Sequence, residues 1–210
     1  ALLVKLRHPN IVQVEACFKD GSMLYIQMPL YSGGNLKTFL CNEPEAFVTD
    51  GRLREQRRKI VADVLLAVDR VHSLDGGGSV HNDIKLSNVL LKDGQQTTAV
   101  LIDFETAQDR SRQQTGLTTT QHQAVGTHAY MAPERLDPDH GNPFSVPRGS
   151  WSTDMYSVGV LLLLAFCPEL IERVEGGQIT PIDGLEEFRE SLEAPGALYH
   201  WLLSLLDNPL

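Results

Sequence analysis

The chain has 210 residues, of which 42% are hydrophobic and 21% are charged, and its formal net charge is −9. This length allows one sizeable domain or two small lobes, and the composition is ordinary for a globular protein. Residues 168–210 hold nine acidic residues and two arginines, which argues against nucleic-acid binding through bulk electrostatics. The longest apolar run, at 158–167, is shorter than the roughly 20 residues that cross a bilayer, so we expect no membrane span.

The first 30 residues predict a short helix and then a β-hairpin. Apolar residues recur at helical spacing in residues 1–8, and Pro9 ends this helix because its ring and missing N–H are incompatible with helical hydrogen bonding. Runs rich in β-formers at 11–18 and 23–28 lie on either side of the turn sequence KDGS. Two strands alone make a marginal sheet.

A short helix is predicted after the glycines of YSGGN (31–35), and a long amphipathic helix at 53–72, where apolar residues recur every three or four positions. The basic run at 52–59 is interpreted as the solvated face of this helix. Residues 75–80 are rich in glycine but lack the Lys and Ser/Thr of a phosphate-binding P-loop, so we interpret them as an insertion. An apolar hairpin is predicted between residues 88 and 103, and the remainder is expected to be helices and loops.

The cysteines, Cys17, Cys41 and Cys167, are scattered along the chain. They are too few for a disulfide framework and too far apart for a CxxC metal site. We therefore expect a reducing compartment, intracellular and cytoplasmic, with the thiols buried as small hydrophobic groups.

Four short motifs follow one another with characteristic separations. They are HNDIKLSN at 81–88, IDF at 102–104, GTHAYMAPE at 126–134 and DMYSVGVLLL from Asp154 onward. Each alone is a weak signal, but their order and spacing together are a strong one. With them the chain resembles a eukaryotic-type protein kinase of the Ser/Thr branch over nearly its whole length.

The resemblance implies an α+β, protein-kinase-like bilobal fold that consists mostly of the helical C-lobe. Residues 1–28 would be an N-lobe remnant with the end of helix C and the last two strands, 29–35 the hinge, and 36–210 the C-lobe. The sequence contains no glycine-rich strand-loop-strand and no strand Lys ahead of this remnant. Because both ends look cut, we expect a partial kinase domain that is inactive as an isolated fragment.

The resemblance also assigns roles around ATP and Mg²⁺, the implied cofactors. Asp83 would orient the substrate hydroxyl and Lys85 would neutralise the γ-phosphate, the two catalytic roles. Asn88 and Asp103 would hold the metal ions through hard oxygen ligands.

The adenine site is expected around the hinge. By resemblance, Met28 is the gatekeeper, the Pro29 carbonyl and the Tyr31 N–H face the adenine edge, and Asn35 lies near the ribose. Leu90 would be the apolar floor under the ring. Plain core packing is the competing interpretation for the apolar members of this set.

Two further groups carry the resemblance. Thr127 and Glu134 belong to the activation segment, and Thr127 with Lys85 indicates a protein substrate with a Ser or Thr acceptor. The residues of the internal stack that links the lobes support the fold more than the activity. They are Leu3, Val14, His81 and Phe104, anchored by Asp154.

Two positions depart from the family pattern. Asn82 replaces an Arg and cannot clamp a phosphorylated segment bidentately, which puts control by phosphorylation in doubt. Glu105 replaces a Gly, which removes a residue free to adopt positive φ and sets a carboxylate beside the metal site. The alternative function is therefore a catalytically impaired pseudokinase that acts as a scaffold. A small-molecule phosphotransferase is disfavoured by residues 126–134, which resemble a peptide-docking segment.

Overall fold

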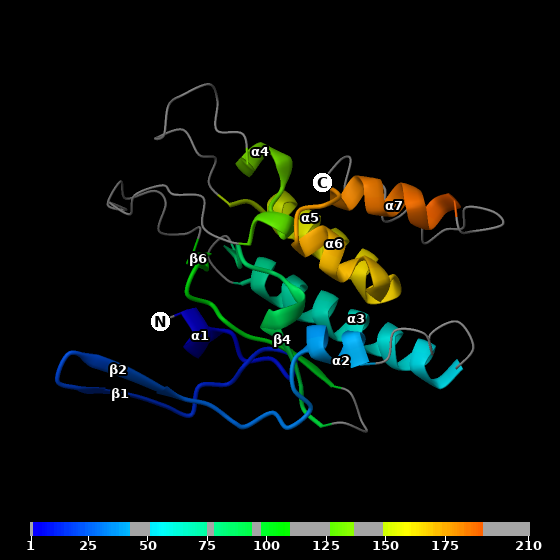
Figure 1. The fold of residues 1–210 in the computed structure, drawn as a ribbon. Helices are drawn as coiled ribbons and strands as arrows, with labels where there is room; N and C mark the ends of the chain where they lie inside the picture. The colour runs from blue at the N-terminus through cyan, green and yellow to red at the C-terminus, as the bar shows by residue number, and fades with distance from the viewer. Residues whose placement is uncertain are drawn as a thin grey trace.

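The computed structural model describes residues 2–42, 51–74, 78–93, 98–109, 127–136 and 149–190. Figure 1 shows most of the helices gathered together, with α1 nearer to a β-hairpin that projects from the body. The helices are α1 (Leu2–Lys5), α2 (Leu36–Asn42), α3 (Gly51–His72), α4 (Pro133–Leu136), α5 (Trp151–Phe166), α6 (Ile171–Glu175) and α7 (Pro181–Glu190), with 3₁₀ turns at Leu86–Asn88, His128–Tyr130 and Pro168–Leu170. The strands are β1 (Ala16–Asp20), β2 (Met23–Gln27), β3 (Ser79–Val80), β4 (Val89–Leu91), β5 (Ala99–Leu101) and β6 (Gln108–Asp109).

The core is built around α3 and α5, which pack against each other. Helix α5 begins with a capping box in which the Ser150 hydroxyl accepts from the Thr153 N–H and the Thr153 hydroxyl accepts from the Ser150 N–H. Most of the helix after this cap is apolar and buried, because it has neighbours on all sides. The long amphipathic helix predicted at 53–72 is confirmed as α3, and its C-terminal end lies beside β3.

The described strands form three two-stranded antiparallel sheets, β1–β2, β3–β6 and β4–β5. The predicted apolar hairpin is confirmed as β4–β5, with Val89 opposite Leu101. The predicted first strand begins later than expected, because residues 11 and 12 pair with Leu101 instead of with β2. Ile11 forms a parallel bridge with Leu101, and the Val12 N–H donates to the Leu101 carbonyl at 2.9 Å.

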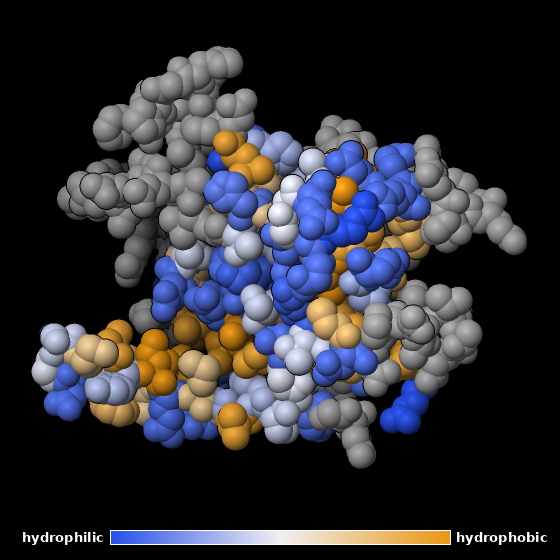
Figure 2. All heavy atoms as spheres, in the orientation of Figure 1, coloured by the Kyte–Doolittle hydropathy of each residue, from blue (hydrophilic) through white to orange (hydrophobic). Residues whose placement is uncertain are grey.

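The β1–β2 hairpin is apolar and exposed. Figure 2 shows hydrophobic side chains along it at the lower left. Its exposed hydrophobic residues include Phe18, Met23, Leu24, Tyr25 and Ile26, and Leu24 reaches 63% exposure. The hairpin therefore contributes little to the buried core and is held mainly by its own ladder and the Phe18–Tyr25 ring stack.

Two expectations about side chains were wrong. Arg57, assigned to a solvated helix face, is 1% exposed, and its Nη1 donates to the Ala165 carbonyl at 3.2 Å near the end of α5. The guanidinium serves one of the orphan carbonyls of a helix C-terminus there. Cys17 and Cys41 are exposed and only Cys167 is buried. Of the glycine-rich insertion, residues 75–77 lie outside the described residues.

No single helix within the described ranges is long and apolar enough to cross a membrane. The pair formed by α5 and residues 168–175 passes that test only when taken together across a bend of 111°. Most of α5 is buried in the core.

Candidate active site

The loop that carries the first motif is anchored by Asp154, which is 1% exposed in the first turn of α5. The His81 N–H donates to Asp154 Oδ2 at 2.8 Å and the Asn82 N–H to Oδ1 at 2.9 Å. His72 Nε2, at the end of α3, lies 2.9 Å from Oδ2. One buried carboxylate thus ties this loop to both long helices.

The His81 ring is buried and fixed in one tautomer. Its Nε2 lies 3.0 Å from the Ile102 carbonyl, which can only accept, and its Nδ1 accepts from the Asp83 N–H at 3.3 Å. Burial lowers the pKa of His81, against the opposing effects of nearby carboxylates and of the Ile102 carbonyl. Phe104 lies edge-on to the ring at a centroid distance of 4.6 Å. The imidazole is therefore a neutral structural link between the two motifs.

The Asp83 carboxylate lies at the centre of a polar cluster. Lys85 Nζ donates to Asp83 Oδ2 at 2.7 Å, and Asn88 Nδ2 donates to the same oxygen at 2.9 Å. The Thr127 N–H and hydroxyl lie 3.2 and 3.3 Å from Oδ1, and Lys85 Nζ also reaches the Thr127 hydroxyl at 2.9 Å.

These contacts keep the Asp83 carboxylate ionised. Burial raises the pKa of Asp83, but the hydrogen bond and charge of Lys85 and the hydrogen bonds from Asn88 and Thr127 outweigh it. The pKa therefore lies below the usual value of 3.8. The cluster is an oriented anion with a cation beside it, which is suited to accepting a hydrogen bond from a hydroxyl group.

Asn88 and Asp103 lie at the same end of the β4–β5 hairpin. Asn88 directly precedes Val89, which pairs with Leu101, and the Ile102 N–H donates to the Asn88 carbonyl at 3.0 Å. Asn88 turns its amide nitrogen toward Asp83, which leaves its side-chain oxygen as the ligand it can offer. Asp103 is exposed and takes one weak contact, from the Glu105 N–H at 3.4 Å.

This donor set fits Mg²⁺ bound together with phosphates. Within the described ranges, no cluster of three or more His, Cys, Asp or Glu side chains could hold a metal by itself. Mg²⁺ commonly binds through one or two protein oxygens and completes its shell with substrate phosphates and water. One amide oxygen and one accessible carboxylate meet that requirement.

Backbone strain is concentrated at the same place. Among the described non-glycine residues, positive φ occurs at Asn82 (68°) and Asp103 (64°), a conformation that such residues adopt infrequently and that clusters at functional sites. Glu105 does not share it. The left-handed turn in this segment is therefore made by Asp103 and not by the residue that replaces the family's Gly.

Comparison with known proteins identifies the family. The family model described as the protein kinase domain matches residues 1–196. The chain belongs to the protein kinase domain family. The α+β, kinase-like fold predicted from the motifs is confirmed by this match, and the small sheets and helical body agree with it.

Several protein kinases are similar to this kinase domain. Serine/threonine-protein kinase PkaA of Streptomyces coelicolor is 37% identical over 77% of this chain and 26% of its own length. L-type lectin-domain containing receptor kinase V.7 of Arabidopsis thaliana is 33% identical over 80% of this chain and 24% of its own length. Myosin light chain kinase A of Dictyostelium discoideum is 29% identical over 82% of this chain and 55% of its own length. The chain thus spans about a quarter of the first two relatives.

The residues expected around adenine are only partly brought together. Gly33 and Gly34 exchange backbone hydrogen bonds with Leu91, and Asn35 forms a bridge with the half-buried Leu90. Asn35 Oδ1 also accepts from the Thr38 N–H at 2.9 Å and from its hydroxyl at 3.1 Å. The side chain expected near the ribose is therefore the N-cap of α2.

The other residues predicted for the hinge and the activation segment are partly or fully exposed. Met28 is 44% exposed, while Pro29 and Tyr31 are half-buried. Glu134 is exposed in the first turn of α4. In the predicted stack, Phe104 and Leu3 pack on the core and Val14 is half-buried.

Sequence reasoning missed Thr106 and Arg135. The Thr106 hydroxyl donates to the His81 carbonyl at 2.9 Å. Arg135 is 6% exposed, and its Nη1 donates to Asn82 Oδ1 at 3.3 Å. An isolated Arg after an activation-segment motif carries no sequence signal of burial, so only the packing reveals it.

Proposed function

We propose that the protein is an ATP-dependent protein kinase that transfers the γ-phosphate of ATP to Ser or Thr hydroxyls of a protein substrate. The observation that carries this proposal is the Asp83 carboxylate held ionised between Lys85 and Thr127. Phosphoryl transfer depends on positioning and charge neutralisation more than on covalent chemistry, and this cluster provides both.

The geometry supports the following proposed roles. Each Asp83 oxygen already accepts two hydrogen bonds, so the substrate hydroxyl would replace the longest of them, from the Thr127 hydroxyl at 3.3 Å, while Lys85 keeps its contact. Lys85 places a positive charge beside the position of the transferred phosphoryl group. Asn88 and Asp103 would hold Mg²⁺, which supplies charge neutralisation at the ATP phosphates when it is bound. The exposed Met28 and the half-buried Pro29 and Tyr31, with Leu90, would contact the adenine.

The Ser/Thr acceptor is supported by two observations. Thr127 and Lys85 both contact Asp83, so the activation segment is directly joined to the catalytic loop. The similar protein from Streptomyces coelicolor is named a serine/threonine-protein kinase.

A non-catalytic scaffold is the second candidate, because Glu105 adds a carboxylate two residues from Asp103, and the Glu105 N–H contacts the Asp103 side chain at 3.4 Å. This added negative charge could compete with the ATP phosphates for the metal.

The test is phosphate transfer from labelled ATP by the full-length protein that contains this chain. We expect Mg²⁺-dependent labelling of Ser/Thr peptides, little labelling of Tyr peptides, and none by Asp83→Asn. Labelling that persists in Asp83→Asn would refute the assigned role. If the unmodified protein showed neither labelling nor ATP-dependent thermal stabilisation, the result would favour the non-catalytic scaffold.

A further inference from the structure

Asn82 occupies a closed position next to Asp83. Its Nδ2 donates to the Thr106 carbonyl at 2.9 Å, and its Oδ1 accepts from Arg135 Nη1 at 3.3 Å. A Cβ added to Gly149 would lie 1.5 Å from Asn82 Oδ1, so Gly149 closes the remaining side. The residue is 7% exposed. Position 82 is thus held by three segments that are distant in sequence.

Arg135 brings a positive charge into this enclosed region from α4. Burial lowers the pKa of Arg135, while the negative charges of Asp154 and Glu134 act in the opposite direction. A buried charge is tolerated when hydrogen bonds and an opposite charge compensate it. Asp154 accepts the Asn82 N–H at 2.9 Å, while Arg135 donates to the Asn82 side chain. Asn82 therefore bridges a buried anion and a buried cation.

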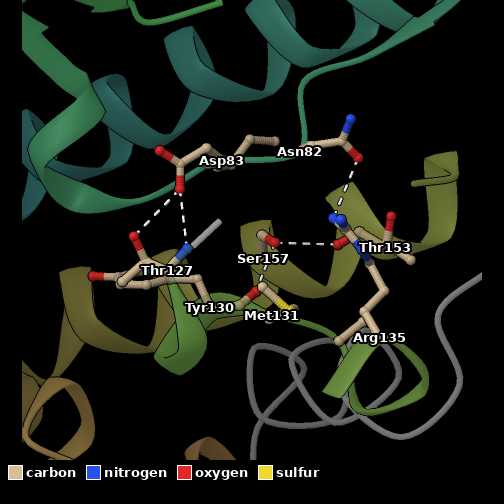
Figure 3. A pocket seen from close by; sticks show the side chains of 10 residues that line it. Asn82, Asp83, Thr127, Tyr130, Met131, Arg135, Thr153 and Ser157 are labelled. Carbon is tan, nitrogen blue, oxygen red and sulfur yellow. Dashed lines mark hydrogen bonds between the residues drawn. The ribbon is translucent and has the colours of Figure 1, made fainter. Parts of the chain in front are cut away.

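The bridge lies in a small pocket directly beside Asp83. Figure 3 shows the Arg135 side chain extending from α4 toward Asn82, with Asp83 on the same loop. Asn82, Asp83, Thr127, Arg135, Thr153 and Ser157 are among the residues that line the pocket. Because Asp83 directly follows the left-handed residue Asn82, any relaxation of φ at Asn82 moves the Asp83 carboxylate.

We propose that Arg135 is a positioning residue of the phosphotransfer site, which acts through Asn82 on the backbone that carries Asp83. This inference rests on the proposed kinase function. The positive charge that the kinase resemblance leads one to expect at position 82 enters the same region from position 135. Arg135 thereby joins the end of the activation segment to the catalytic loop without a phosphate group.

The test compares Arg135→Met with Arg135→Lys in the full-length protein. We expect Arg135→Met to lower kcat about 10- to 100-fold with little change in the KM for ATP, since a small misplacement of a catalytic group has an effect of this size. Arg135→Lys keeps the charge and should recover most of the loss. Arg173→Met is the matched control, because Arg173 forms an exposed ion pair with Glu187 at 2.6 Å, away from the site.

A charge exchange separates positioning from simple structural support. Asn82→Arg alone sets two guanidinium groups side by side and should lower both Tm and kcat. The double variant Asn82→Arg, Arg135→Met restores a single cation and should be more active than Asn82→Arg. An unchanged kcat in Arg135→Met would overturn the proposal. The proposal would also be overturned if Arg135→Met and Arg135→Lys lost kcat equally and the loss matched the decrease in the folded fraction of each variant.

A measurement that does not depend on enzymatic activity tests this proposal separately from the kinase function. The Tm values of Asn82→Ala, Arg135→Met and their combination form a double-mutant cycle. We expect the combined Tm loss to be smaller than the sum of the single losses. If the unmodified protein transfers no phosphate, the kinase function fails, while a non-additive cycle still supports the link between Arg135 and the loop. Additive Tm losses would overturn that link.

Discussion

The region proposed for catalysis, here called the catalytic side, and the region proposed to contact the nucleotide, here called the nucleotide side, are built differently. On the catalytic side, Asp83 and its neighbours are partly or fully buried and share hydrogen bonds with segments from 72 to 154. On the nucleotide side, Met28 and the β1–β2 hairpin are exposed and pair mainly with themselves. The arrangement around Asp83 is therefore fixed by the helical core, whereas the proposed nucleotide contacts would depend on a more exposed surface.

The largest expected effect is on the catalytic side. Asp83→Asn removes the negative charge and one of the two oxygens that could accept the substrate hydroxyl, but leaves the Asn88 and Asp103 oxygens in place. We expect kcat to fall about 10³-fold, while ATP affinity changes little. Steady-state kinetics and calorimetric titration with Mg²⁺ and ATP measure the two quantities. A comparable loss of ATP affinity would show that the two sides are not separable.

The reverse pattern is expected at Asp103. Asp103→Asn weakens an exposed oxygen ligand, so Mg²⁺-dependent ATP affinity should fall roughly 10-fold, in the range found for altered metal-site residues. The unfolding free energy should stay within about 0.5 kcal/mol of the original, because the side chain is on the surface. Binding measured with and without Mg²⁺ checks the first expectation, and equal losses in both conditions would contradict it.

Acid pH should lower the free energy of unfolding, because it protonates His81, which is buried on the catalytic side. Burial holds the pKa of His81 below 6.5 in the folded protein, so the unfolded chain binds the proton first as pH falls. The stabilisation is complete above about pH 6.5 and is lost below it as pH approaches the folded pKa, by up to about 1.4 kcal/mol per pH unit.

Denaturant unfolding at several pH values measures this effect. His81→Gln should lose this part of the pH slope, whereas a matched change at the exposed His128, His128→Gln, should keep it. An identical slope in His81→Gln and the unmodified protein would exclude His81 as the source.

The smallest effect is expected at Glu105. This residue is exposed and does not take positive φ, so Glu105→Gly relieves no strain and removes only a screened surface charge. We expect kcat to change roughly two- to three-fold, a small part of the catalytic total. A gain of about 100-fold would instead show that the carboxylate suppresses catalysis, as the scaffold alternative requires.

The success of sequence reasoning differed between these parts. The motif order gave the family, and helical periodicity gave α3, because both signals are local in sequence. The contact between Lys85 and Thr127 could not be predicted in this way, because these residues are 42 positions apart and only the fold brings Lys85 Nζ within 2.9 Å of the Thr127 hydroxyl. Asn35 illustrates another limit, because the same residue type suits a helix cap or a ribose contact and the sequence does not choose between them. Arg57 and Arg135 were unpredictable because burial of a charge depends on its partners.

The three contacts to Asp154 also govern how the protein reaches its native state. They join positions separated by 82, 73 and 72 residues, and closing such long loops is slow compared with forming helices. We therefore expect the loop conformation around Asp83 to form late, after α3 and α5 have docked. A collapsed intermediate would have nearly native helical content and no phosphotransfer site, so recovery of activity during refolding should lag behind recovery of the helical signal.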